Sequence, residues 1–264
     1  MTSTVLTCLY AGDNPHYFRM YLEDIYSNSC MLDSVIIVVD GPVTLELNCI
    51  LDNIRNDTFF KVIRLPENKG LVNALNVGLV SCTSEYCIRL DPDDRMSKDR
   101  VAKINKKFLT SNADVVFNGV KIIDDEDVEL GIDSPNQREI FKRNPFYHSG
   151  SAYKLSVVRN IGLYRDFKDF EDYDLWLRII RAGLNIEIIA EPLSSFRVSR
   201  AMVNRRCGLD YMLAEIRFLK VALIEGNLKR RFLFFWMLRI LSRLLPSSLI
   251  VRLRSVYFDH IKII

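Results

Sequence analysis

The first two hundred residues alternate between short apolar runs and longer segments in which apolar residues recur at helical spacing. The short runs predict strands at residues 5–10, 35–39, 60–65, 86–90, 114–123, 186–190 and 194–198. The periodic segments predict helices at residues 17–26, 71–79, 97–108 and 171–183. The run at 35–39 is apolar on both faces, so helices must cover it from two sides. We therefore expect an α/β fold with a mostly parallel sheet flanked by helices.

The stretch Cys87–Asp94 carries the clearest chemical signal in the chain. Its apolar strand breaks into three carboxylates within four residues, and Pro92 forces a turn between them. Asp91 and Asp93 can then converge outside the strand end, which is where open α/β sheets bind ligands. Carboxylates crowded in this way favour a bound cation, and oxygen ligands suit Mg²⁺ or Mn²⁺. A solvated, Asp-rich turn before a helix is the alternative for this stretch taken alone.

Two other positions fall where a ligand of such a sheet would lie. Asp40 stands at the end of the 35–39 strand, where it either binds a ribose or a base or simply starts the turn at Gly41. Asn68 and Gly70 open the next helix, whose first N–H groups either face an anion or are capped in the ordinary way. The pattern alone leaves both alternatives open at each position.

A second acidic group begins the helix predicted at 171–183. Four carboxylates gather at its start, which exceeds what helix capping requires, so one of them could act as a general base. These residues are Asp169, Glu171, Asp172 and Asp174. The acidic run at 124–127 is instead predicted to be the solvated tip of a hairpin, and a lone histidine such as His148 is more often structural than catalytic.

Composition narrows the class of protein further. The chain has 264 residues, enough for one large α/β domain, and its net charge of +3 gives no support for nucleic-acid binding. Its six cysteines contain no Cys-x-x-Cys pair and no zinc spacing, which predicts reduced thiols. We see no signal peptide at the start and no stretch of about 20 apolar residues that would predict a spanning helix. We expect a cytoplasmic protein.

The tail after Arg200 differs in character from the rest of the chain. No acidic residue occurs between Glu225 and Asp259, while seven basic residues do: Lys229, Arg230, Arg231, Arg239, Arg243, Arg252 and Arg254. One arc of the predicted helix is apolar, and Phe232 and Trp236 lie beside its arginines; the arc consists of Leu233, Met237, Ile240, Leu241 and Leu244. Pro246 separates a second short helix. A basic amphipathic helix favours the membrane surface, with its arginines at anionic headgroups, and packing onto the preceding domain is the alternative.

Taken in order along the first two hundred residues, these motifs resemble the family 2 glycosyltransferases of the GT-A fold. The pattern comprises Asp40-Gly41, the Asn-x-Gly-x-x-x-Ala-x-Asn-x-Gly helix at 68–78, the Asp-Pro-Asp-Asp turn at 91–94, the Glu-Asp-Tyr-Asp-Leu-Trp-Leu-Arg segment at 171–178, and Phe196-Arg197. Pro42 departs from it, since two acids followed by Gly-Ser are more usual there. The basic tail is similar to that of bacterial enzymes that extend lipid-linked O-antigen repeat units.

The resemblance implies a role for each of these residues. The implied donor contacts are Asp40 at the uridine, Asn68, Gly70, Asp91 at the ribose or a metal-bound water, and Arg197 near the diphosphate. Asp93, with Asp91, would hold the Mn²⁺ or Mg²⁺ ion that bridges the diphosphate, and Asp94 would support the turn. Asp172 would be the general base with Glu171 beside it, and Glu171 and His148 would contact the acceptor.

The reaction implied by the resemblance is an inverting transfer in a single displacement. A base deprotonates the acceptor hydroxyl as it attacks the anomeric carbon, and a metal neutralises the leaving diphosphate. The implied donor is a UDP-sugar, with galactose favoured and glucose next, and the acceptor an undecaprenyl-diphosphate-linked amino sugar that receives a β-linked hexose. The implied location is the cytoplasmic face of the inner membrane, as a peripheral protein that binds no nucleic acid.

We divide the chain into a GT-A catalytic domain at 1–200 and a helical, membrane-associating tail at 201–264. The nucleotide-binding half would span about 1–95 and the acceptor half about 96–200. Two other functions stay open. A nucleotidyltransferase acting on sugar phosphates also uses an α/β sheet and metal carboxylates, although residues 11–15 lack its Gly-rich, basic loop. A membrane module that only binds nucleotide sugars is the other, and the presence of Asp93 and Asp172 argues against it.

Overall fold

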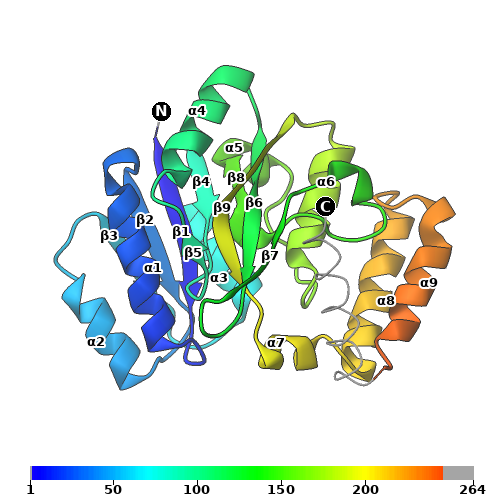
Figure 1. The fold of residues 1–264 in the computed structure, drawn as a ribbon, viewed down its shortest axis with the longest axis horizontal. Helices are drawn as coiled ribbons and strands as arrows, with labels where there is room; N and C mark the ends of the chain where they lie inside the picture. The colour runs from blue at the N-terminus through cyan, green and yellow to red at the C-terminus, as the bar shows by residue number, and fades with distance from the viewer. Residues whose placement is uncertain (1, 246–264) are drawn as a thin grey trace.

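Strands and helices alternate through residues 2–245, the part of the chain that this computed structural model describes (Figure 1). The strands are β1 (Ser3–Leu9), β2 (Ser34–Val39), β3 (Phe60–Arg64), β4 (Tyr86–Arg89), β5 (Arg95–Met96), β6 (Val115–Ile123), β7 (Glu129–Asp133), β8 (Ser151–Lys154) and β9 (Ile186–Arg197). The helices are α1 (Pro15–Asn28), α2 (Leu45–Asn53), α3 (Leu71–Ser81), α4 (Arg100–Ser111), α5 (Leu155–Asn160), α6 (Glu171–Arg181), α7 (Arg200–Arg205), α8 (Leu209–Ile224) and α9 (Leu233–Ser242). Short 3-10 helices lie at Ser29–Met31, Gln137–Glu139, His148–Gly150 and Arg230–Phe232.

The strands form one sheet in the order β3-β2-β1-β4-β8-β6-β9-β5, with β7 paired to the side of β6. The strands of the first ninety residues are parallel, whereas β8 runs antiparallel to both β4 and β6. Figure 1 shows helices on both faces of this curled sheet, which confirms the α/β fold predicted from the sequence. Because β1, β2 and β4 are parallel, their carboxyl ends share one edge, where a ligand is expected.

Alternating residues of the central strands enter two separate hydrophobic clusters, one on each face of the sheet. Leu6 and Val38 face the cluster that contains α3 and α6, whereas Val5 and Val39 face the cluster with α1 and α4. Gly78 explains how closely α3 lies on this sheet. A β-carbon at Gly78 would come within 2.3 Å of Leu6 Cδ1. The glycine therefore offsets its cost to the helix by allowing close contact with β1.

The structure corrects two boundaries predicted from the sequence. The late strands predicted at 186–190 and 194–198 are one strand, β9, whose register against β6 shifts on both sides of Gly119. A β-carbon at Gly119 would lie 2.5 Å from the carbonyl oxygen of Ala190, so only glycine permits this irregular pairing. Helix α4 begins at Arg100, after Asp99, rather than at residue 97 as predicted, and the Ser97 hydroxyl donates a 2.8 Å hydrogen bond to Asp99.

The described part of the tail packs onto the sheet domain, which was the alternative to a purely membrane-bound tail. Phe218 of α8 stacks on Phe170 with the ring centroids 5.1 Å apart. Trp236 of α9 is buried, stacks on Tyr173, and donates its indole N–H to the carbonyl oxygen of Phe141 at 2.9 Å. Figure 1 shows α8 and α9 side by side at one end of the molecule, continuing its core beyond α6.

The arginines of α9 do not have the surroundings predicted from the sequence. Arg239 and Arg243 both pair with Glu215 of α8, at 2.7 and 2.9 Å, and Glu215 is fully buried. They therefore hold α8 to α9 instead of meeting lipid headgroups. The predicted second helix after Pro246, with Arg252 and Arg254, lies outside the described residues. Within 2–245, no helix is both long and apolar enough to cross a bilayer.

Candidate active site

The Asp-rich turn lies between β4 and β5, at the edge where the parallel strands end, as predicted. Arg89, the last residue of β4, is fully buried and donates to the carbonyl oxygens of Leu6 and Leu90. Its guanidinium also pairs with the carboxylate of Asp91, which accepts a 2.9 Å hydrogen bond from the Ser149 hydroxyl. Burial alone would raise the pKa of Asp91, but the Arg89 charge holds this pKa below its usual value. Asp91 is therefore a fixed carboxylate.

Asp94 supports this turn from inside the protein. Its side chain is buried and accepts a 2.9 Å hydrogen bond from the backbone N–H of Arg197. Burial and the nearby charge of Asp93 raise the pKa of Asp94 well above its usual value. The turn is thus anchored by buried partners, which is unlike the solvated Asp-rich turn that the sequence left as an alternative.

Arg197, at the end of β9, fixes the Asp-rich turn and the neighbouring β6–β7 hairpin through the nitrogens of its guanidinium group. Its Nε donates to the carbonyl oxygen of Asp93 at 2.9 Å and its Nη1 to that of Asp124 at 2.6 Å. Its Nη2 pairs with Asp127 at 2.5 Å, and the guanidinium lies 3.9 Å from the ring centroid of Tyr17. All three nitrogens are used within the protein. A direct contact with a diphosphate stays a prediction, and the contacts present are those of a positioning residue.

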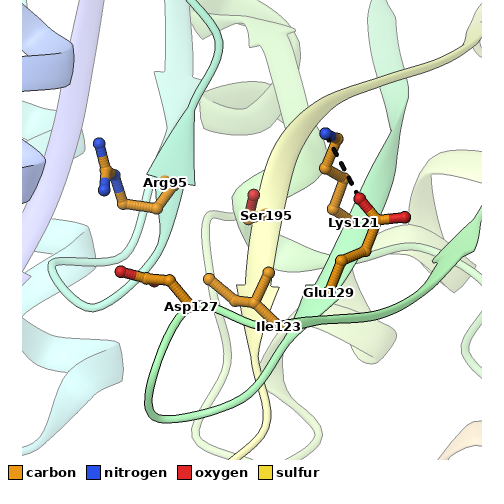
Figure 2. Close-up of a pocket in the computed structure, with 6 residues that line it drawn as sticks. All are labelled: Arg95, Lys121, Ile123, Asp127, Glu129 and Ser195. Atoms are coloured by element: carbon orange, nitrogen blue, oxygen red, sulfur yellow. Dashed lines mark ion pairs between the residues drawn. The ribbon is translucent and has the colours of Figure 1, made fainter.

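The acidic run at 124–127 is the tip of the β6–β7 hairpin, as predicted, but it is not simply solvated. Asp127 is paired with Arg197, and the carbonyl oxygen of Asp125 accepts a 2.8 Å hydrogen bond from the Tyr17 hydroxyl of α1. Figure 2 shows the hollow beside this tip, lined by Arg95, Lys121, Ile123, Asp127, Glu129 and Ser195. Within it Lys121 pairs with Glu129 at 3.5 Å, and none of the predicted site residues lines it.

Asp13 joins the acidic group, although the sequence interpretation missed it. It follows β1 at the same edge of the sheet, and its carboxylate accepts the Tyr10 backbone N–H at 2.8 Å. Burial and the charges of Asp93 and Asp91 raise the pKa of Asp13 to about 7. Burial and the charge of Asp91 raise that of Asp93 to about 6. The strand-end rule could have identified Asp13, because β1 ends beside β4.

This excess of carboxylates fits a divalent cation. Among residues 2–245, no group of three or more carboxylate, histidine or cysteine side chains is arranged to hold a metal by itself. Mg²⁺ is commonly held by only one or two carboxylates together with substrate phosphates. Asp91 and Asp93 supply that number, and burial together with the charge of Asp91 raises the pKa of Asp93, an effect that a bound cation would oppose.

The predicted donor residues at the end of β2 are brought together, but in contacts with one another. Both carboxylate oxygens of Asp40 are used, by the N–H groups of Lys69 and Gly70 at 2.8 Å each. The Gly70 N–H is therefore occupied by Asp40 and is not free for an anion. Of the two alternatives that the sequence left open, this contact corresponds to capping within the protein. The Asn68 side chain also accepts from Gly70, at 3.2 Å. Contacts of Asp40, Asn68 and Gly70 with a donor stay predictions.

Glu171 and Asp172 begin α6 as an acidic pair. Asp172 accepts hydrogen bonds from the Asn144 amide at 2.9 Å and from the Tyr173 backbone N–H at 2.6 Å. Burial and the neighbouring Asp172 raise the pKa of Glu171 to about 8. Burial raises the pKa of Asp172 to about 6, and the hydrogen bonds limit the rise. At neutral pH, the pair therefore keeps Asp172 as its mainly ionised member.

Asp174 has a structural role, so not all four carboxylates at this helix start are candidates for the base. It is buried and pairs with Arg178 at 2.8 Å and with Arg165, which also pairs with Glu225 of the loop after α8. This network ties α6 to the tail. The sequence showed the charges, and the i,i+4 spacing of Asp174 and Arg178, but not that Asp174 faces inward, because Arg165 and Glu225 come from other parts of the chain.

His148 lies behind this pair as a neutral group. Its Nε2 is 2.8 Å from the hydroxyl of Tyr164, and its ring packs edge-on against Trp176. Burial and the Arg89 charge lower the pKa of His148 to about 3, so the ring is uncharged at neutral pH. Contact with an acceptor stays a prediction for His148.

Comparisons with known proteins agree with this fold. Residues 4–161 match the family described as glycosyl transferase family 2. An uncharacterized glycosyltransferase of Haemophilus influenzae is 33% identical over 97% of this chain and 99% of its own length. The UDP-Gal:α-D-GlcNAc-diphosphoundecaprenol β-1,3-galactosyltransferase of Escherichia coli is 34% identical over 93% of this chain and 92% of that protein. The amylovoran biosynthesis glycosyltransferase AmsE of Erwinia amylovora is 31% identical over 92% of this chain and 94% of its own.

Among solved structures, S. aureus TarS 1–349 in complex with UDP-GlcNAc superposes with a TM-score of 0.68 and 17% identity. The match covers 92% of this chain and 72% of that one, and it identifies the fold as GT-A. The fold and the acidic strand edge thus define a GT-A transferase. The chain belongs to glycosyl transferase family 2 and is a glycosyltransferase, as the sequence motifs predicted. This membership decides against the nucleotidyltransferase and against the module that only binds nucleotide sugars.

Proposed function

We propose that the protein is an inverting, metal-dependent hexosyltransferase that moves galactose from UDP-galactose to an amino sugar linked to a lipid diphosphate. Glucose is the next donor sugar to consider. The product would be a β-linked extension of a bacterial polysaccharide repeat unit such as that of an O-antigen. Two relatives support this class of reaction, since one is named for that galactosyl transfer and the other for amylovoran biosynthesis.

The observation that carries the proposal is that one short segment contacts both the turn after β4 and helix α6: the Ser149 hydroxyl donates to Asp91, and the His148 ring packs on Trp176. In addition to burial, the charge of Asp91 raises the pKa of Glu171 and of Asp172. Because residues 148 and 149 join them, the turn after β4 and the start of α6 border one space, and the effect of the Asp91 charge agrees with this arrangement. A diphosphate held at the turn would present its sugar to an acceptor hydroxyl held at Asp172.

Within this space the two members of the acidic pair take different roles. Asp172 is the proposed general base, because it is mainly ionised at neutral pH and can take the proton of the attacking hydroxyl. The Asn144 amide and the Tyr173 N–H orient its carboxylate. Glu171, mainly protonated at the same pH, can donate a hydrogen bond to the acceptor. Because the hydroxyl attacks the anomeric carbon directly, no covalent nucleophile is needed.

The donor would lie across the ends of β2 and β4. Asp93 and Asp91 are the proposed ligands of Mn²⁺ or Mg²⁺, which when bound would neutralise the charge that develops on the leaving diphosphate. Asp40 would border the uridine, within the nucleotide-binding half at about 1–95. His148 would lie on the acceptor side, in the half at about 96–200.

The donor and acceptor are tested together in one experiment. The protein is incubated with a panel of UDP-sugars and a short-chain synthetic diphosphate-lipid N-acetylglucosamine, and the product is identified by mass. We expect the acceptor to gain one hexose, with UDP-galactose as the best donor. A product that gains a nucleotidyl group, or hydrolysis of the donor with no acceptor product, would contradict the proposal.

We also propose that the outer face of α9 rests on the membrane that holds the acceptor. Eight large apolar side chains between residues 233 and 245 are 37–61% exposed. Lys142 and Lys229 border them, 5.2 Å from the ring centroid of Phe235 and 4.6 Å from that of Phe141. Apolar side chains edged by basic ones match an anionic lipid surface. On the opposite side of α9, Trp236 stacks on Tyr173, so a docked helix would bring Asp172 close to the lipid-anchored sugar.

Substitution of Phe234 and Leu238 by serine is expected to move the enzyme from the membrane to the soluble fraction. Activity on a water-soluble acceptor should survive better than activity on a long-chain lipid acceptor. The measurement is fractionation with paired assays, and the control replaces Val80 and Leu109, two exposed apolar residues elsewhere, by serine. Unchanged fractionation, or equal loss of both activities, would refute membrane docking. Truncation from Lys229 is a poorer test, because it removes the buried Trp236.

A further inference from the structure

Arg206 is a half-buried arginine that the reaction described so far does not use. It lies between α7 and α8, and its backbone N–H donates to the carbonyl oxygen of Met202 at 3.3 Å. Its Nε is buried and has no hydrogen-bond partner among residues 2–245. Arg89 and Arg100 also leave one nitrogen unpaired, but both donate from other nitrogens to protein oxygens. A buried guanidinium donor without an acceptor is costly, which points to a ligand that completes its contacts.

The surroundings of Arg206 place it on the acceptor side of the site. Tyr211, at the start of α8, packs on Phe170 with the ring centroids 5.2 Å apart, and Phe170 directly precedes Glu171. The segment after α7 is thereby held against the start of α6. The charge of Arg206 acts on Asp172 and on Tyr211. By contrast, the positive charges that act on Asp93 come from Arg197 and Arg89.

The chemistry of the acceptor explains why a free cation would lie there. In the proposed reaction, the acceptor hydroxyl must reach Asp172, and its diphosphate is attached to the anomeric carbon of the same sugar. The diphosphate must therefore lie within about one sugar ring of the base. An arginine presents a planar set of donors that matches phosphate oxygens and stays charged at all relevant pH values.

We propose, on the basis of the function proposed above, that Arg206 binds the diphosphate of the lipid-linked acceptor. It thereby selects diphosphate-linked sugars over neutral glycosides. The donor diphosphate belongs to the other side of the site, at Asp91 and Asp93. Arg206 is thus a specificity-determining residue of the acceptor site.

The test compares Arg206→Ala with Arg205→Ala, which removes the exposed neighbouring arginine. Each variant is assayed with N-acetylglucosamine carrying a short alkyl diphosphate and with the corresponding neutral alkyl glycoside. We expect Arg206→Ala to raise the KM for the diphosphate acceptor by roughly 10- to 100-fold, the effect of losing a charged hydrogen bond. Activity on the neutral acceptor should fall much less than activity on the diphosphate acceptor, since only the effect of the Arg206 charge on Asp172 is lost there. Arg206→Lys should restore part of the preference, and Arg205→Ala should keep all of it.

Calorimetric titration of the same alkyl diphosphate sugar into the UDP-loaded protein measures this binding without any transfer. Weaker binding by Arg206→Ala, with unchanged UDP binding, supports the assignment even if the sugar transferred is not the one proposed. Equal loss on both acceptors would show that Arg206 acts only through Asp172, and weaker UDP binding would assign it to the donor. Either result overturns the inference. If the wild type binds the diphosphate but transfers no hexose, the proposed function fails while the inference stands.

Discussion

Replacing Asp172 by asparagine is expected to lower turnover by roughly 10²-fold or more while the UDP-sugar still binds. The substitution keeps the shape of the side chain and one oxygen that can accept from the Tyr173 N–H, but replaces the other oxygen, which accepts from Asn144, by an NH2 group and removes the basicity that takes the acceptor proton. The measurement is steady-state turnover with UDP-galactose and a diphosphate-linked acceptor, together with titration of UDP into each variant.

Glu171→Gln is the matched control for this prediction. Because Glu171 is mainly protonated at neutral pH, its replacement by glutamine should cost less turnover than Asp172→Asn. The pKa of Asp172 gives a second check, since the wild-type turnover should fall as the pH drops through about 6 and the base becomes protonated. If Glu171→Gln loses turnover while Asp172→Asn keeps it, the two roles are reversed.

Replacing Asp93 by alanine is expected to reduce transfer to background, a loss of at least roughly 10²-fold. Asp93 is proposed to hold the metal against the leaving diphosphate, and its burial beside the charge of Asp91 favours a bound positive charge there. Chelation with EDTA should remove wild-type activity in the same way, and added Mn²⁺ or Mg²⁺ should restore it.

Asp125→Ala provides the matched control for Asp93→Ala, because Asp125 is an exposed carboxylate at the tip of the neighbouring hairpin. Its structural contact uses the backbone carbonyl oxygen, which alanine keeps. This variant should retain wild-type activity and the same response to metal. Full activity of the wild type in EDTA would exclude the role proposed for Asp93.

The sequence was sufficient to predict strands and helices in which apolar residues cover at least one complete face. The run at 35–39 and the helix with Trp176 lie where periodicity predicted them, because each buries enough apolar surface to determine its own conformation. Shorter elements were missed for the opposite reason. With two residues in β5 and four in β8, alternation has too few positions to be read. These strands exist because β9, β4 and β6 offer them partners.

The candidate site residues that follow a strand or begin a helix could be predicted from the sequence. Asp91 and Asp93 were singled out because they follow an apolar strand, where α/β sheets bind ligands, and Asp172 because four carboxylates at one helix start exceed what capping requires. Their buried partners were not predictable in this way. Arg89 occupies a position in an apolar strand, and nothing in its local sequence indicates that its buried guanidinium pairs with the carboxylate of Asp91.

The ion-pair partners of the arginines in α9 were also not predictable from the local sequence. Their helix contains no acidic residue, so the sequence around Arg239 and Arg243 predicted headgroups of lipids as their partners. The partner is Glu215, which lies on α8 and is brought to them only by the packing of the two helices. Charge pairing between distant segments depends on the tertiary fold, whereas periodicity does not.

The anomeric configuration of the product tests the central claim most directly. A single displacement with Asp172 as the base inverts the sugar carbon, so an α-linked UDP-galactose should give a β-linked galactoside. NMR of the purified product distinguishes the two, because the coupling between H1 and H2 of the galactose is large in the β form and small in the α form. A large coupling is the predicted result, and a small one would contradict the inverting mechanism.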